Sequence, residues 1–374
     1  MTDRYPVLAE FAAHSAYSKD RVEELRTLHA GDAEAFWREQ AGRLSWSKPF
    51  SVVKNVSFHK ADFRIKWFED GELNVAVNCL DRHLPEHAGK TAIIWESDDP
   101  ETTAQRISYQ ALHHRVCQLA NAMENLGIAK GDRVTLYLPM IPEAAVAMLA
   151  CARIGAVHSV VFAGFSPDSI AARLEDSASK LIITASAGQR GGKWIALKAL
   201  VDEALRQKGT ASVETVLVVR HGPVAPPMQM PRDRWFDEVV GPQPKTHSPT
   251  AMNAEDPLFL LYTSGSTGKP KGVLHTTGGY LLQASFTHEA VFDLRPDDVY
   301  WCTADIGWIT GHSYLLYGPL ANASTTLMFE GVPSYPDYSR FWQVVDKHQV
   351  SIFYTAPTAI RALMREGEAP VNKY

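Results

Sequence analysis

The chain has 374 residues and a formal net charge of −5, with 45% hydrophobic and 21% charged residues. These proportions are typical of a globular protein, because a disordered chain is poorer in apolar residues and more lopsided in charge. The mild acidic excess argues against a general binder of nucleic acid or of anionic membranes, since such proteins carry a basic excess. The length predicts two domains, or one large domain with an appendage.

The cysteines and the apolar stretches indicate the compartment. Cys79, Cys117, Cys151 and Cys302 form no Cys-x-x-Cys pair, which predicts buried thiols in a reducing compartment. The N-terminus shows no apolar run of a secretory signal, and prolines and charged residues interrupt the most apolar stretch, 134–165, which excludes a membrane span there. We therefore expect a cytoplasmic protein with neither a membrane nor a nucleic acid as partner.

Residues 1–80 differ in pattern from the residues that follow. Large aromatic side chains such as Trp37, Trp46 and Trp67 stand among charged residues with little alternation. This pattern predicts a helical, loop-rich cap that docks on a larger body and has no core of its own. Residues 81–374 would form that body.

From about residue 90, short apolar runs alternate with amphipathic stretches. Helices are expected to begin after Ser108, at Pro142 and after Ser166, and two of them to end at Gly127 and Gly155. Strands are expected at 91–95, 134–138, 158–162, 181–184, 213–219, 258–262 and 352–354, and further helices at 194–208, at 338–348 and from Pro357. This order predicts an α/β fold with mainly parallel sheets covered by helices, and the proline-rich stretch 221–257 reads as a surface connection.

A run of glycines, hydroxyl residues and lysines directly follows the strand expected at 258–262. It consists of Thr263, Ser264, Gly265, Ser266, Thr267, Gly268, Lys269, Pro270 and Lys271. Glycines allow backbone N–H groups to turn toward an anion, and hydroxyls and lysines add donors and positive charge, so the run predicts a polyphosphate-binding loop. It is not a Walker A loop, because the Gly-x-x-x-x-Gly-Lys-[Ser/Thr] spacing is not matched.

The same run also matches Ser-x-x-Lys, the signature of some serine acyl-enzymes, through Ser266 and Lys269. That chemistry places the serine at a helix start, where Pro270 would fall inside the helix. No Ser-Asp-Asn or Lys-Thr-Gly partner accompanies it. A serine hydrolase or amidase therefore stays a minor alternative, as does a non-catalytic nucleotide-binding remnant.

The segment 262–280 resembles the adenylate-forming enzymes, and its extension His275 to Tyr280 resembles the AMP-forming acetyl-CoA synthetases within them. Segments 67–74, 301–312 and 354–358 agree with this likeness, which covers essentially the whole chain. The resemblance implies a reaction of acetate, Mg-ATP and CoA that gives acetyl-CoA, AMP and diphosphate through an acetyl-adenylate. A propionyl-CoA or other short-chain acyl-CoA synthetase is the alternative within this class. Mg²⁺ would enter with ATP, and neither a metal site within the chain nor a tightly bound organic cofactor is expected.

The resemblance also assigns site residues. Thr263 to Lys271 would bind the ATP phosphates, Trp308, Ile309 and Thr310 would form the acyl pocket, and the CoA-binding residues would be Arg190, Gly191, Gly192, Lys193, Thr310 and Ser334. Lys193 stands where the family has an arginine, and Ser334 where it usually has asparagine.

The spacing of His113, His114 and Cys117 could suggest a metal site. Because no fourth ligand is in view, we expect these residues to occupy surface or partly buried positions of a helix instead.

The family's chains continue well past the equivalent of Tyr374. Motifs around adenine, the ribose-binding aspartate and a C-terminal domain with the catalytic lysine would lie in that further part. The resemblance therefore implies that residues 1–374 correspond to an N-terminal portion and, as they stand, form an inactive fragment. The sequence does not indicate an oligomeric state.

Overall fold

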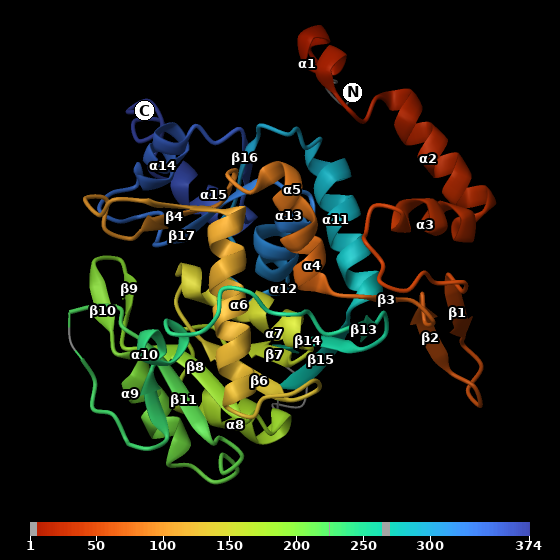
Figure 1. The fold of residues 1–374 in the computed structure, drawn as a ribbon. Coiled ribbons are helices and arrows are strands. Elements are labelled where there is room, and N and C mark those ends of the chain that lie inside the picture. The colour runs from red at the N-terminus through yellow and green to blue at the C-terminus, as the bar shows by residue number, and fades with distance from the viewer. Residues whose placement is uncertain (1–5, 224, 264–269) are drawn as a thin grey trace.

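Two mainly parallel β-sheets form the centre of the molecule, in a computed structural model that describes residues 6–223, 225–263 and 270–374 (Figure 1). The first sheet has, in spatial order, the seven strands β12 (Asp233–Trp235), β11 (Thr215–Val219), β8 (Leu181–Ala185), β6 (Arg133–Tyr137), β7 (Val157–Val160), β14 (Pro257–Thr263) and β15 (Lys271–Thr276). The second has the five strands β18 (Ile352–Tyr354), β16 (Val299–Cys302), β17 (Thr325–Glu330), β4 (Thr91–Ser97) and β5 (Gln105–Ser108). Only the edge strands β15 and β5 pair antiparallel with their neighbours in these described sheets. The fold is therefore α/β, as the sequence predicts.

Helices with clear local start and stop signals connect the strands. Helix α6 (Tyr109–Asn125) begins after Ser108, whose side chain accepts a hydrogen bond from the backbone of Ala111. Helix α7 (Pro142–Ile154) begins at its proline and ends at Gly155, which has the positive φ of +73° that a glycine adopts at little cost. Helix α8 (Pro167–Ser177) is capped by Ser166. These three predicted helix starts are confirmed.

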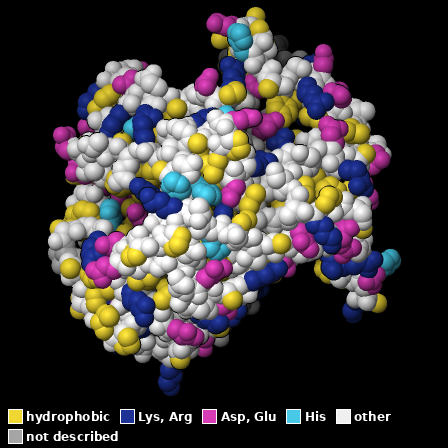
Figure 2. Space-filling model, in the orientation of Figure 1, with side chains coloured by type: hydrophobic (Ala, Val, Ile, Leu, Met, Phe, Trp, Pro, Cys, Tyr) yellow, Lys and Arg dark blue, Asp and Glu magenta, His cyan; other side chains and the backbone are white. Residues whose placement is uncertain are grey.

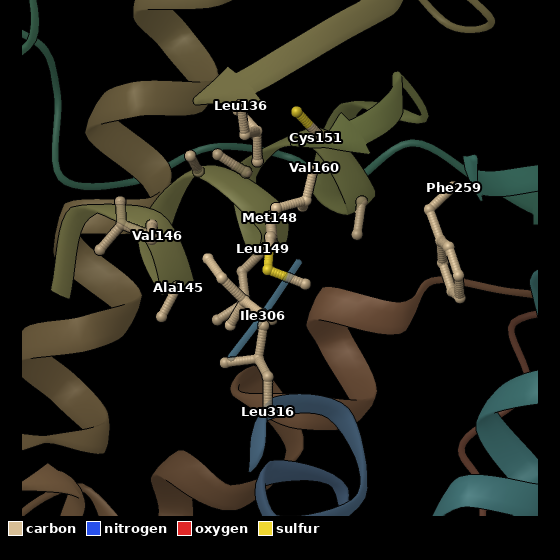
Figure 3. Packing of buried hydrophobic residues seen from close by; sticks show 14 of the residues in the cluster. Leu136, Ala145, Val146, Met148, Leu149, Cys151, Val160, Phe259, Ile306 and Leu316 are labelled. Atoms are coloured by element: carbon tan, nitrogen blue, oxygen red, sulfur yellow. The ribbon is translucent and has the colours of Figure 1, made fainter. Parts of the chain in front are cut away.

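One hydrophobic core joins the two sheets. Helix α7 is buried along almost its whole length, and the core cluster contains α6 and α7 together with strands of both sheets. Figure 3 shows Met148 and Leu149 of α7 between Val160 of the seven-stranded sheet and Ile306 and Leu316 of the C-terminal half. Because α7 contacts both halves, it fixes how the two sheets sit relative to each other.

The N-terminal region is a cap without a separate core. It comprises α1 (Ala9–His14), α2 (Lys19–Gly31), α3 (Ala33–Ala41), β1 (Lys54–Ser57), β2 (Arg64–Trp67), β3 (Glu72–Leu73) and α4 (Val75–Cys79), and the body begins with η1 (Asp81–His83) and α5 (Leu84–His87). Phe36 of α3 packs edge-on against Phe286 of the body, with ring centroids 5.7 Å apart. Phe68 and Leu73 are members of the main core cluster. Residues of the cap are therefore buried against the body.

The remaining elements complete the body around the two sheets. They are β9 (Gly188–Arg190), β10 (Lys193–Ile195), α9 (Leu197–Leu205), α10 (Phe236–Val240), β13 (Met252–Asn253), α11 (Gly278–Phe292), α12 (Ile309–Gly311), η2 (His312–Tyr317), α13 (Gly318–Ala321), α14 (Arg340–His348) and α15 (Pro357–Met364). The start of the helix expected at 194–208 is wrong, because Trp194 lies in strand β10. The connection 221–257 contains β12, α10 and β13.

Other surface and burial features agree with the composition. Acidic and basic side chains intermingle over the face seen in Figure 2, as the small net charge leads one to expect. All four cysteines are free and buried, which confirms the prediction of buried thiols. Among the described residues, no helix is long and apolar enough to cross a lipid bilayer.

A buried carboxylate holds α14 to the five-stranded sheet. Glu96 of β4 is fully buried, and its oxygens lie 2.8 Å from Nη2 of Arg340, 2.9 Å from Nζ of Lys347 and 2.7 Å from Nε2 of His348. Burial alone would raise the pKa of Glu96, but hydrogen bonds from these three side chains outweigh it and lower the pKa to about 2. The ionised carboxylate is therefore the form that stabilises the fold.

We predict that Glu96→Gln lowers the free energy of unfolding at pH 7 by about 3 kcal/mol, because it leaves the fully buried Arg340 guanidinium without its counter-ion. Since folding depresses this pKa, the stabilisation is complete above pH ~4.5 and is lost as the pH falls toward 2, so the difference between variant and parent should shrink over that range. Urea denaturation at several pH values measures it. Glu24→Gln, at the exposed pair with Arg21, is the control and should change stability by under ~1 kcal/mol; an equally small effect of Glu96→Gln at pH 7 would show that this cluster does not hold α14.

Candidate functional site

A cavity of about 860 Å³ lies where the strands of both sheets end. Segments that directly follow six parallel strands (β6, β7, β8, β16, β17 and β18) contribute to its wall. Ligand sites of open parallel sheets characteristically lie at these carboxyl ends. The lining residues include Pro139, Met140, Phe162, Gly164, Gln189, Arg190, Asp305, Trp308, Thr310, Glu330, Val332, Tyr354, Thr355 and Pro357.

The structure brings three sequence-predicted residues to this cavity. Arg190, Trp308 and Thr310 line it, and the Arg190 guanidinium lies 5.7 Å from the ring centre of Phe162. Ile309, beside two lining residues, is 43% exposed. The residue from β9 therefore meets the residues at the start of α12, although β9 and α12 are far apart in the chain.

The turn between β9 and β10 requires its two glycines. Gly191 and Gly192 have positive φ values of +59° and +74°. A Cβ atom on Gly192 would approach the ring of Tyr335 to 2.6 Å, so a side chain has no room there. Lys193 follows at the start of β10 and is exposed. Ser334 is exposed next to the lining residue Pro333.

The predicted phosphate loop lies mostly outside the described residues. This holds for Ser264, Gly265, Ser266, Thr267, Gly268 and Lys269. Its described flanks, Thr263 and Lys271, are cross-strand partners of β14 and β15. Strand β14 runs parallel to β7, so Thr263 lies at the same edge of the sheet as the cavity-lining residues that follow β7.

Asp305 is a site residue that the sequence reasoning did not single out. It lines the cavity directly after β16, and its Oδ1 accepts a hydrogen bond of 2.6 Å from the backbone N–H of Gly307. Burial raises the pKa of Asp305 to about 6, although the Gly307 amide and the Arg190 charge oppose the shift. Its position after an apolar strand, inside segment 301–312, was the signal that could have found it.

Two further carboxylates and a histidine lie near Arg190. Asp98 and Glu330 are buried, and the ring of His221 contacts Glu330 at 2.8 Å. Nothing in the local sequence marks these three residues, because they come from separate elements.

Within the described parts of the chain, no group of three or more His, Cys, Asp or Glu side chains could hold a metal ion. His113 instead lies 3.3 Å from Asp81.

Comparisons with known proteins agree with this geometry. The profile of the family described as "AMP-binding enzyme" matches residues 80–374, and that of "Acetyl-coenzyme A synthetase N-terminus" matches residues 23–79. The chain is 63% identical over 373 residues to an acetyl-coenzyme A synthetase of Xanthomonas campestris pv. campestris, covering all of this chain and 58% of that protein. It is 58% identical over 369 residues to the enzyme of the same name from Parvibaculum lavamentivorans, covering 99% of this chain and 57% of the relative. The chain thus spans little more than half the length of these curated relatives.

A solved structure shares the fold. The acetoacetyl-CoA synthetase from Streptomyces lividans superposes with a TM-score of 0.83 at 23% identity. The match covers 92% of this chain and 52% of that one. At this identity the likeness supports the arrangement of sheets and helices alone.

We predict that Asp305→Asn stabilises the protein at pH 8 by roughly 1–2 kcal/mol. The folded state raises this pKa, so the parent loses stability as the pH rises through about 6, whereas asparagine keeps the hydrogen bond to Gly307 without a charge. The advantage of the variant should shrink by about 1 kcal/mol between pH 8 and pH 5. Chemical denaturation at both pH values tests this, with the exposed Asp297→Asn as a control that should show no such difference. If Asp305→Asn is less stable than the parent at pH 8, burial does not raise the pKa of Asp305.

Proposed function

The chain belongs to the AMP-binding enzyme family, and from this premise we propose that the protein containing it is an AMP-forming acetate–CoA ligase. Residues 1–80 are the acetyl-CoA synthetase type of cap and residues 81–374 the AMP-binding domain. The observation that carries the proposal is that Arg190, which is far from Trp308 and Thr310 in the chain, lines one cavity together with them. The identity of about 60% to acetyl-coenzyme A synthetases over nearly the whole chain supports acetate as the acid.

In the first step, an acetate oxygen attacks the α-phosphorus of Mg-ATP and the bond to diphosphate breaks. Negative charge builds up on the leaving diphosphate, so fixed cations and amide donors lower the barrier. Lys271, with Thr263 opposite it on β14, supplies such groups at the edge of the sheet. The loop residues 264–269 supply the rest of the phosphate contacts in this proposal.

In the second step, the sulfur of CoA attacks the acetyl carbonyl carbon and AMP leaves. The thiol proton is released as the carbon–sulfur bond forms. Arg190 is the anchor for the phosphates of CoA, since a guanidinium binds phosphate through paired hydrogen bonds. Lys193 adds a positive charge but cannot form such paired hydrogen bonds. Trp308 and Thr310 form the wall between the acyl group and the incoming thiol.

The proposed function also implies the substrates, the metal ion and the compartment of the reaction. The partners are ATP, acetate and CoA, Mg²⁺ arrives bound to ATP, and the site of action is the cytoplasm. A propionyl-CoA or other short-chain synthetase remains the second candidate, because a missing methylene group costs a pocket only ~1–3 kcal/mol of discrimination.

The activity is tested with the intact protein, acetate, Mg-ATP and CoA. We expect acetate-dependent exchange of diphosphate into ATP, and CoA-dependent formation of acetyl-CoA and AMP. Omission of acetate is the control and should abolish the exchange. Trapping of an acyl group on Ser266 would favour a hydrolase instead, and tight ATP binding without exchange would favour a nucleotide-binding protein.

The acyl preference should depend on Ile309. We predict that Ile309→Gly shifts preference toward propionate and butyrate, because it removes a bulky side chain beside the cavity-lining Trp308 and Thr310. The ratio of kcat/KM for acetate and butyrate measures the shift. Val371→Gly is the matched control, since Val371 is also 43% exposed but lies outside the residues that line the cavity. A change in the ratio below about threefold, or ~0.7 kcal/mol, would mean that Ile309 does not shape the acyl pocket.

A further inference from the structure

Two buried carboxylates accept hydrogen bonds from the backbone on either side of Arg190. Oε1 of Glu330 accepts from the N–H of Gln189 at 3.1 Å, and Oδ2 of Asp98 accepts from the N–H of Gly192 at 2.7 Å. Gln189 and Gly192 flank the pair Arg190–Gly191. The two acids therefore hold the ends of the short turn that carries the cavity-lining arginine.

The two carboxylates come from neighbouring strands of the five-stranded sheet. Glu330 ends β17 and Asp98 directly follows β4, and β17 and β4 are parallel, with Glu330 paired to Ser97. Strands β9 and β10 form a separate two-stranded sheet. In the described chain, this small sheet is joined to the five-stranded sheet by the two backbone bonds and by a 3.5 Å contact between Ser97 Oγ and Gln189 Oε1.

Glu330 is itself held from the other side. The Nε2 of His221 lies 2.8 and 3.0 Å from the two oxygens of Glu330. The backbone of His221 is fixed by Ser186, whose Oγ accepts from its N–H at 2.9 Å and donates to its carbonyl at 2.6 Å. The ring of His221 lies edge-on to Trp194 of β10, with centroids 5.4 Å apart. Burial raises the pKa of Glu330, and the hydrogen bond from His221 opposes this shift.

We propose that Asp98 and Glu330, with His221 behind Glu330, are positioning residues that fix the turn of residues 189–192 so that the Arg190 side chain faces the cavity for the phosphates of CoA. This inference rests on the function proposed above. It extends that function by separating residues that bind CoA from residues that only set the backbone that presents them.

The chemistry of the two carboxylates supports a role through the backbone. A carboxylate beside a phosphate site weakens anion binding by repulsion, so Asp98 and Glu330 are poorly suited to contact CoA themselves. As acceptors of backbone N–H groups they form strong, charge-assisted hydrogen bonds. A turn fixed before binding also avoids the cost of ordering it on binding, and a displacement of about 1 Å in a reacting assembly can lower the rate ~10²-fold.

The test separates the two half-reactions of the intact protein. Asp98→Ala and Glu330→Ala should each raise the KM for CoA at least ~10-fold. In Asp98→Ala, whose side chain is not among the residues that line the cavity, acetate-dependent exchange of diphosphate into ATP should stay within about threefold of the parent. Asp98→Asn and Glu330→Gln keep an oxygen that accepts the backbone hydrogen bond, so they should restore the KM for CoA to within about threefold. Asp99→Ala is the matched control, because Asp99 accepts hydrogen bonds from Glu101 and Thr102 of its own turn, and should change neither quantity.

Hydrogen exchange of the Gln189 and Gly192 amides gives a readout independent of activity. These amides should exchange at least ~10-fold faster in the alanine variants and at the parental rate in Asp99→Ala. If the alanine variants do not fold, the conservative variants Asp98→Asn and Glu330→Gln still test the proposal. A 10-fold rise in the KM for CoA in either of them would overturn the backbone role. Equal losses in both half-reactions would indicate a general structural role and also overturn it.

Arg190→Ala separates failure of this inference from failure of the proposed function. An unchanged KM for CoA in Arg190→Ala would remove Arg190 from the CoA site and, with it, the part of the proposed function on which the inference rests. A raised KM in Arg190→Ala with no change in Asp98→Ala and Glu330→Ala would leave the CoA site intact and refute the positioning role. A raised KM in all three supports both.

Discussion

Burial of helix α7 between two parallel sheets is the constraint on which the rest of the structure depends. Because nearly every face of this helix is covered, the sheets cannot shift relative to each other without exposing the shared core. Each parallel sheet gathers the ends of its strands at one edge, and the fixed arrangement brings both edges to the same cavity. A short apolar helix thereby determines which loops can meet a ligand together.

The features predicted from sequence are those with local causes. The start of α6 depends on the Ser108 side chain, and the end of α7 on a left-handed Gly155, and both signals are contained in a few consecutive residues. Strands β9, β10 and β15 gave no such signal. They are short or lie at an edge, and β10 and most of β15 are exposed, so neither alternation nor a continuous apolar run marks them.

In the candidate site, too, some residues have local sequence signals and others do not. Arg190, Trp308 and Thr310 could be named from motifs, whereas their common cavity depends on tertiary structure. Gln189 is separated from Glu330 by 141 residues, and Gly192 from Asp98 by 94. Contacts of this range follow from the pairing of β4 with β17, which no local pattern encodes. The residues proposed to bind a ligand were thus more predictable than those proposed to hold them in place.

In the function proposed above, adenylate and CoA meet in the cavity between the carboxyl ends of the two sheets. A crystal structure of the intact protein with CoA and a non-hydrolysable analogue of acetyl-adenylate tests it most directly. We expect the acyl end of the analogue beside Trp308 and a phosphate of CoA within hydrogen-bonding distance of the Arg190 guanidinium. Density for both ligands away from the cavity, with Arg190 facing solvent, would contradict the account.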